Sequence, residues 1–426
     1  MTQEELKRKA RNLIREFKGD TYVFGLGCLP GAGPLARELG GRVCLITSLH
    51  IRDPENFHRL SESLQGSGLT IAGHTRSARP NAPREDVARI RETILETRPE
   101  FIFAASGGSG IDATKAAIVL ASLGGDVEDY FGTGKVTEKR KEAGKKLLPL
   151  IALQTASSSA AHLTKYANIT DLSTHQKKLI VDEALVPQRC LFDYELTFSM
   201  SHSVTCDGAL DGLAHLLEVY SGSKGDALQK IEEIALTGTG LILGQLEKAL
   251  ASPEDPEARE ALGLATDLGG YAIMMGSTSG PHLMSFSLVD VLSHGRACAV
   301  LNPYFIVLFS RAITPQVKKL ASLMAAHRLI SNQEARLRGR DLAEAVARGL
   351  VQLNRRVGLP GSLSEVEGFR PAHAEKILDA AKDPALEMKL RSMPIPMTAA
   401  TVEKSLRPLL EAAEVGDLRK VPVLAG

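Results

Sequence analysis

The sequence is poor in the residues that characterise several large classes of protein. Its 426 residues include no tryptophan, aromatic side chains make up only 4% of it, and the formal net charge is +1. Proteins that bind single-stranded nucleic acids stack the bases on aromatic side chains within a basic groove, and anionic membranes also attract basic surfaces. We therefore expect neither a nucleic acid nor a membrane as a partner.

Cysteine and long apolar stretches are also scarce. The five cysteines form no C-x-x-C pair and occupy positions 28, 44, 190, 206 and 298. An odd and dispersed set is typical of reduced thiols, not of a disulfide framework. The sequence has no run of about 18 or more apolar residues, the length that a membrane helix needs, and its opening segment MTQEELKRKARNLIREF lacks an apolar signal core. These features predict a cytoplasmic protein.

The pattern of apolar residues divides the chain into two parts. A chain of 426 residues is too long for one typical core, so two domains are the first expectation. Short apolar runs alternate with helical periods as far as residue 198, which predicts an α/β dinucleotide-binding domain over 1–198. Long helical periods then dominate, including one over 297–328, and predict an all-helical domain over 199–426. The segment LIVDEALVPQRCLFDYELT is interpreted as β-hairpin-like material that closes the first domain.

Two glycine-rich turns follow apolar runs in the first domain. The first lies in TYVFGLGCLPGAG and the second in FIFAASGGSGIDATKA, and each opens a helical pattern. Backbone N–H groups at such a turn can approach a phosphate at the helix N-terminus. The first turn alone is weak evidence, because its spacing is not G-x-G-x-x-G and a tight turn explains it as well. Together the two turns suit a dinucleotide whose pyrophosphate rests on the second turn.

Four metal-ligand side chains lie in the first half of the helical domain. Asp211 and His215 are four residues apart in a segment with helical apolar spacing, so they lie on the same side of a helix, one turn apart. His282 and His294 follow later in the chain. Three imidazoles and one carboxylate suit a catalytic divalent metal with a position left open for substrate, whereas closed structural zinc sites more often use cysteine.

Some of these candidate ligands have alternatives. Asp207, two turns before His215, competes with Asp211, and His282 and His294 could serve in the core or as a helix cap. The identity of the metal is also open. The usual order of affinities places Zn²⁺ above Fe²⁺ at such a site, so purified protein can carry zinc whatever the cell supplies.

These motifs resemble those of the iron-containing, or group III, alcohol dehydrogenases, and the resemblance covers nearly the whole chain. SGGSGIDATKA resembles that family's pyrophosphate turn GGGSxxDxAK, DGLAHLLEVY resembles its metal helix DALxHAxEAY, and SHGRACAVLNPY resembles its segment PHGxANAxxxP. The metal-helix and HG matches are specific in combination, whereas the glycine turns are not. The resemblance implies a dehydroquinate synthase-like fold, in which a Rossmann-like α/β domain precedes an all-α metal-binding domain.

The resemblance also implies an activity and its residues. A hydride would pass between NAD(P)H and a carbonyl or alcohol held at Fe²⁺ or Zn²⁺ in the cleft between the domains. The implied metal ligands, which are also catalytic, are Asp211, His215, His282 and His294. The implied cofactor-binding residues are Ser48, Gly107, Gly108, Ser109, Asp112, Thr155, Ser158 and Lys177. The substrate would be an alcohol or aldehyde, and the family implies a homodimer or higher homo-oligomer.

The sequence departs from the family pattern at several positions. Ser48 stands where an aspartate usually accepts hydrogen bonds from the adenosine ribose. Without that carboxylate a 2′-phosphate becomes permissible, and His50 and Arg52 are near in sequence, so we favour NADP over NAD. Phe286 stands where a histidine near the nicotinamide is usual, which removes a proton relay. His162, in place of a glutamate, is a candidate catalytic residue that could replace it.

Two other functions stay open. One is a metal-dependent lyase or cyclase of the dehydroquinate synthase type, which uses the nicotinamide only transiently. The other is a non-catalytic nucleotide-binding relative. The DGLAH and SHG motifs argue against the first, and the presence of all four candidate ligands argues against the second. Net turnover of NAD(P)H and the metal content would distinguish these possibilities.

Overall fold

The computed structural model describes residues 1–425, which form two compact units. The α/β unit comprises Asn12–Thr205 and Ser252–Gly263. The helical unit comprises Met1–Arg11, Cys206–Ala251 and the chain from Leu264 onward. Three short segments, residues 1–11, 199–205 and 252–263, thus group differently from a single division after residue 198, and that division stays a prediction. Among the described residues, none of the helices is long and apolar enough to cross a membrane.

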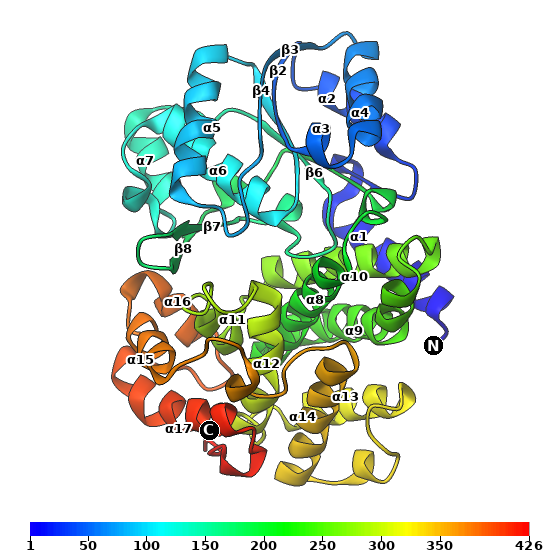
Figure 1. Cartoon of the computed structure of the whole chain (residues 1–426), viewed down its shortest axis with the longest axis vertical. Helices are drawn as coiled ribbons and strands as arrows, with labels where there is room; N and C mark the ends of the chain where they lie inside the picture. The colour runs from blue at the N-terminus through cyan, green and yellow to red at the C-terminus, as the bar shows by residue number, and fades with distance from the viewer. Residues whose placement is uncertain (426) are drawn as a thin grey trace. The chain divides into compact units, whose positions relative to one another are not determined.

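A parallel sheet forms the centre of the α/β unit (Figure 1). Within residues 1–425 it has six strands in the spatial order β1-β9-β6-β4-β2-β3, and all neighbouring strands run parallel. The strands are β1 (Tyr22–Gly25), β2 (Arg42–Thr47), β3 (Thr70–Thr75), β4 (Phe101–Ser106), β6 (Leu150–Gln154) and β9 (Arg189–Asp193).

Strand β9 lies in the interior of this sheet, between β1 and β6. The prediction of β-hairpin-like material is therefore wrong for this strand, although the residues before it do form an antiparallel pair. That pair is β7 (Tyr166–Asp171) with β8 (Gln176–Val181), and the short β5 (Gly132–Thr133) extends it. The apolar run of β9 shows that the strand is buried, but not which strands it pairs with, because pairing depends on distant segments.

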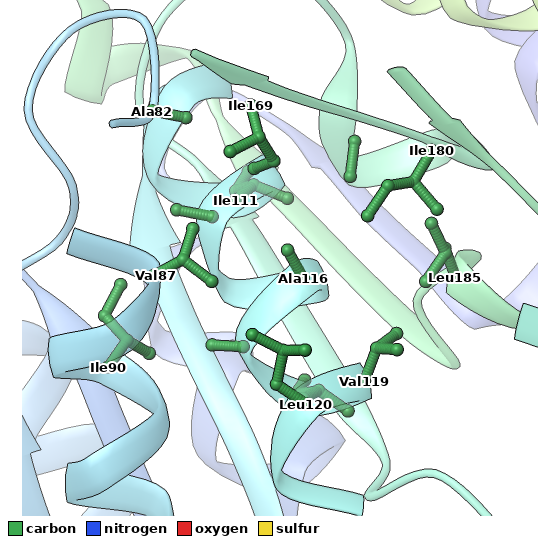
Figure 2. Close-up of a cluster of buried hydrophobic side chains, with 14 of the residues drawn as sticks. Ala82, Val87, Ile90, Ile111, Ala116, Val119, Leu120, Ile169, Ile180 and Leu185 are labelled. Carbon is green, nitrogen blue, oxygen red and sulfur yellow. The ribbon is translucent and has the colours of Figure 1, made fainter. Parts of the chain in front are cut away.

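Helices cover both faces of the sheet. They are α2 (Ala32–Arg37), α3 (Leu49–Arg52), α4 (Pro54–Gly66), α5 (Arg84–Thr97), α6 (Gly108–Leu123) and α7 (Lys135–Ala143). Successive side chains of a strand point to opposite faces, so Ile102 of β4 joins the core formed with α5 and α6, whereas Phe103 packs with Leu60 and Leu64 of α4. Figure 2 shows side chains of α5, α6, β7 and β8 gathered in the first of these cores.

The order of the strands reverses between β2 and β4. After β2 the chain places β3 on one side and then β4, β6 and β9 successively on the other. Thr47 at the end of β2 pairs with Ala105 of β4, and its Oγ1 donates a hydrogen bond of 2.8 Å to the Ala105 carbonyl. In open α/β sheets, ligands bind at such a reversal, outside the carboxyl ends of the strands. Ser48 and Gly107 lie just beyond these two strand ends.

The chain from residue 202 to 425 contains helices and no strand. The helices, with α1 (Gln3–Lys18) at the other end of the chain, are α8 (His202–Gly222), α9 (Leu228–Ala251), α10 (Pro256–Met275), α11 (Gly280–Ser285), α12 (His294–Leu308), α13 (Thr314–Ala326), α14 (Gly339–Arg356), α15 (Pro371–Ala380), α16 (Glu387–Arg391) and α17 (Val402–Val415). The predicted single helix over 297–328 is wrong, since α12 and α13 are separate. Pro315 lies in the first turn of α13, where its missing N–H has no cost, whereas an unbroken helix would place it in the interior.

Candidate metal centre and nucleotide turn

Helix α8 carries the first two predicted ligands. Its buried apolar residues, among them Leu213 and Leu217, pack this part of the helix into the core. Asp211 and His215 lie one turn apart, and Nε2 of His215 is 3.8 Å from Oδ1 of Asp211. Both side chains are buried, and their spacing of four residues places them on the same side of α8.

His282 and His294 approach the same carboxylate oxygen from two other helices. His282 lies in α11, and His294 is the first residue of α12. Their Nε2 atoms lie 3.5 and 3.7 Å from Oδ1 of Asp211. The structure thus brings the four predicted ligands together from α8, α11 and α12, the helices coloured green to yellow-green in Figure 1.

The arrangement fits a divalent cation. Oδ1 of Asp211 and Nε2 of His282 are buried, and neither finds a hydrogen-bond partner among residues 1–425. A buried carboxylate that lacks hydrogen bonds or counter-charge is costly. An ion held by this oxygen and the imidazoles would remove that cost, and Fe²⁺ and Zn²⁺ both accept such donors.

Hydrogen bonds to Nδ1 orient two of the imidazoles. Oε1 of Glu218 lies 2.6 Å from Nδ1 of His282, and Oγ of Ser285 lies 2.9 Å from Nδ1 of His294. Contacts of this kind direct the opposite Nε2 atoms toward a metal. Glu218 was not predicted from the sequence, although its place three residues after His215 on one helix face was a usable signal.

Asp207, the alternative to Asp211, is engaged elsewhere. Its Oδ1 lies 2.6 Å from Nε of Arg296, and the two side chains form an ion pair. Gly295, between His294 and this arginine, allows α12 to approach α8 closely, because a Cβ at that position would lie 1.9 Å from the backbone oxygen of Asp207. The glycine of the SHG motif therefore places His294 beside Asp211.

The second glycine-rich turn lies at the N-terminus of α6, where Gly107 is the N-cap. A Cβ on Gly108 would lie 2.1 Å from Oγ of Ser159, and a Cβ on Gly110 would lie 2.0 Å from Oγ of Ser106. A side chain at either position would therefore force the neighbouring serine to move. The first N–H groups of a helix have no partner within the helix, so this turn can bind an anion with its backbone.

Ser109 and Lys177 both contact Asn81. The backbone N of Asn81 donates to Oγ of Ser109 at 3.1 Å, and Nζ of Lys177 donates to Oδ1 of Asn81 at 3.3 Å. Asp112 accepts two hydrogen bonds of 3.0 Å from the backbone and side-chain nitrogens of Asn168, and burial raises the pKa of Asp112. Asn81 and Asn168, which connect the predicted residues around the turn, were not identified from the sequence.

The other predicted cofactor residues lie near the same strand ends. The backbone N of Thr155, after β6, donates to the carbonyl of Ser106 at 3.1 Å, and Ser158 is partly buried in the same loop. Ser48, after β2, shares a hydrogen bond with Ser77, their Oγ atoms being 2.7 Å apart. Residues that are distant in the sequence thus gather at the ends of β2, β4 and β6.

Two family models match this chain in succession. The model described as iron-containing alcohol dehydrogenase matches residues 19–194, and the model for the C-terminal part of the Fe-containing alcohol dehydrogenase family matches residues 205–410. The chain belongs to the iron-containing alcohol dehydrogenase family. The predicted family, the predicted fold class and the predicted type of function, a metal-dependent alcohol dehydrogenase, are confirmed.

Individual relatives agree with this membership. The NAD-dependent methanol dehydrogenase of Bacillus methanolicus is 26% identical over 350 residues, which are 81% of this chain and 87% of the relative. Long-chain-alcohol dehydrogenase 1 of Geobacillus thermodenitrificans is 25% identical over 401 residues, 92% of this chain and 95% of the relative. The alcohol dehydrogenase from Oenococcus oeni has the same fold, with a TM-score of 0.78 at 23% identity over 92% of this chain and 97% of its own.

The charge states of two of the candidate ligands, Asp211 and His215, suit metal binding. Burial by itself raises the pKa of Asp211, but the neighbouring imidazoles, of which His215 has the largest effect, lower it by more, so the net direction is downward. Burial lowers the pKa of His215 to about 4. Near neutral pH, Asp211 is therefore ionised and His215 is neutral, the states in which these groups bind a metal.

His162 lies in the interior of the α/β unit. Its side chain is fully buried, Nε2 lies 3.0 Å from Oη of Tyr22, and its ring packs edge-on against Phe192. These contacts favour a structural role over the predicted catalytic one, because a proton relay needs a path to substrate or solvent. Phe286 stacks on the ring of His294 with the ring centres 5.8 Å apart, and a phenyl ring cannot accept a proton.

Proposed function

We propose that this chain interconverts alcohols and aldehydes with Fe²⁺ or Zn²⁺ bound by Asp211, His215, His282 and His294. The observation that carries the proposal is the convergence of three imidazole Nε2 atoms on one buried carboxylate oxygen, at 3.5 to 3.8 Å. A divalent ion in this place would supply Lewis acidity at the substrate oxygen. The hydrogen bonds to Nδ1 of His282 and of His294 would orient these two imidazoles for the ion.

The route of the proton follows from Phe286. Its phenyl ring occupies the family's usual histidine position and lies against His294. We propose that the proton of the substrate hydroxyl leaves through water or a ribose hydroxyl of the cofactor. The contacts of His162 with Tyr22 and Phe192 support leaving it out of this route.

The proposed cofactor is a nicotinamide dinucleotide whose pyrophosphate lies at the N-terminus of α6. Gly107, Gly108 and Ser109 would contact the pyrophosphate there. The remaining residues would line the path toward the ribose and the nicotinamide: Ser48, Asp112, Thr155, Ser158 and Lys177. Support comes from Ser48 and Gly107, which lie at the reversal of strand order, where dinucleotides bind in folds of this type.

A basic pocket beside Ser48 supports NADP over NAD. The pocket has a volume of about 550 Å³ and is lined by His50, His74, Thr75, Arg76, Ser77, Arg79, Asp86 and Arg89. The hydrogen bond between Ser48 and Ser77 joins it to the position where the family's ribose-binding carboxylate is usual. A 2′-phosphate would meet cationic side chains here and no carboxylate at residue 48.

The arginines of this pocket differ in whether an acidic side chain already pairs with them. Nε of Arg79 lies 2.9 Å from Asp86, and Arg89 lies 3.6 Å from the same carboxylate. Arg76 is exposed and forms no ion pair within the described part of the chain. We therefore propose Arg76 as the main phosphate contact. Arg52, which the sequence suggested, does not line the pocket.

The relatives named above are dehydrogenases, which favours this function over a lyase or a non-catalytic role. The cytoplasm and a homodimer or higher homo-oligomer stay expectations from the sequence. An alcohol or aldehyde is the proposed substrate class, with no finer specificity.

Metal content tests the proposed centre. Wild type and the control His58→Ala, whose imidazole is exposed on α4, should hold about one Fe or Zn per chain, and His282→Ala should lose it. NADPH-dependent reduction of aldehydes should fall together with the metal content. A wild type that stays metal-free after anaerobic supply of Fe²⁺ and of Zn²⁺ would overturn the proposal.

A further inference from the structure

The thiol of Cys298 lies beside the candidate metal ligands. One possible ligand atom each from Asp211, His282, His294 and Cys298 lie within 4.8 Å of one another. Cys298 is four residues after His294 on α12, so both side chains emerge from one face of that helix. Cys298 stands where the PHGxANA pattern has an asparagine.

The surroundings of Cys298 differ from those of other cysteines in the chain. Sγ of Cys190 lies 2.8 Å from a backbone carbonyl and Sγ of Cys206 lies 3.9 Å from another, contacts typical of a buried thiol that donates locally. Cys298 instead interacts with the side chain of His282. Nε2 of that imidazole lies 3.5 Å from Oδ1 of Asp211. The sulfur is therefore close to two of the side chains that are proposed to bind the ion.

We propose that Cys298 is a further ligand of the ion at this centre and binds it as a thiolate. The inference rests on the proposed metal binding by Asp211 and the three histidines. On coordination the S–H bond breaks, a metal–sulfur bond forms, and the proton passes to solvent, so no oxidant or reductant takes part. The ligand set becomes a mixed carboxylate, imidazole and thiolate set.

A thiolate ligand changes which metals the centre retains. Soft sulfur donors favour Zn²⁺ and Co²⁺, whereas Mn²⁺ prefers oxygen ligands. Removing the thiol should therefore weaken the binding of Zn²⁺ by about tenfold or more while the binding of Mn²⁺ changes much less. A residue that served only to pack the core would weaken both metals alike, so the ratio of the two affinities separates a ligand from a packing residue.

Cobalt spectroscopy tests the inference directly. The purified protein is exchanged into Co²⁺, whose visible bands report binding and whose near-ultraviolet charge-transfer band reports a thiolate ligand. Wild type should show both kinds of band, and Cys298→Ala should keep the visible bands and lose the charge-transfer band. Cys206→Ala, which removes a buried thiol that donates to the Val357 carbonyl, should keep both.

The outcomes distinguish this inference from the proposed function. Visible Co²⁺ bands without a thiolate band in wild type would overturn the role of Cys298 and leave the four-residue centre intact. Absence of all Co²⁺ bands in wild type would overturn the metal centre itself. Cys298→Ser, which keeps the size of the side chain, repeats the measurement if the alanine variant folds poorly, and loss of the charge-transfer band is again expected.

Discussion

Oε1 of Glu218 lies 2.6 Å from Nδ1 of His282, and both side chains are buried. The second carboxylate oxygen of Glu218 accepts a hydrogen bond of 2.7 Å from the backbone N of Ser279, just before α11. With Nδ1 held in this way, Nε2 of His282 faces Oδ1 of Asp211 at 3.5 Å. A glutamate on α8 thus orients an imidazole that belongs to α11.

Exchange of this glutamate for its amide should weaken metal binding. Glu218→Gln keeps the shape of the side chain but removes the charge that supports the imidazole, and we expect Zn²⁺ affinity to fall by about 10- to 100-fold. Competition with a chromophoric chelator measures it. Glu232→Gln removes a carboxylate that bonds Tyr220 of α8 and serves as the control. Unchanged affinity in Glu218→Gln would contradict the orienting role.

The two aspartates of α8 should behave differently. Asp211→Asn should lose the metal, because the only carboxylate among the four proposed ligands is removed. Asp207→Asn should retain the metal and lose about 1 kcal/mol of stability or less, since its partly exposed ion pair with Arg296 is a weak contribution. Metal analysis and thermal unfolding of both variants measure this. Loss of metal in Asp207→Asn alone would show that the ligand had been assigned to the wrong aspartate.

Two glycines near the centre offer a matched pair. A Cβ on Gly295 would lie 1.9 Å from the backbone oxygen of Asp207, so Gly295→Ala should push α12 from α8, destabilise the fold by about 1–3 kcal/mol and weaken metal binding. A Cβ on Gly212 would find its nearest atom, in Ile242, at 3.9 Å, so Gly212→Ala should fold and bind metal normally. Denaturant unfolding measures the difference, and equal effects would contradict the close-approach argument.

The proposed phosphate pocket predicts a change of cofactor preference. Arg76→Ala should lower kcat/KM with NADPH by about 10- to 100-fold, the loss of one charge-assisted hydrogen bond, and leave NADH nearly unaffected. Ser48→Asp should shift the preference toward NADH, because a carboxylate repels the 2′-phosphate. Fluorescence titration with NADPH gives a second readout without turnover. Arg52→Ala is the control, and a larger effect there than at Arg76 would refute the assignment.

Some features of this protein depend only on residues that are close together in the sequence, and these can be predicted from it. Asp211 and His215 face the same way because four residues make about one helical turn. The alternation of Ile102 and Phe103 across β4 follows from the period of a strand, and the glycines before α6 mark a close backbone approach. The resemblance of the motifs to those of a known family then predicted the family and the set of metal ligands.

Other features were decided only by the tertiary structure. The sequence does not show that β9 enters between β1 and β6, that Arg296 engages Asp207, or that Arg76 borders the pocket beside Ser48 while Arg52 does not. The sequence also does not indicate Cys298 as a possible ligand, because its sulfur lies near the other ligands only where α12 packs against α8. Periodicity encodes the geometry of one element at a time, whereas these contacts arise when elements distant in the chain pack together and place their side chains within a few ångströms of one another.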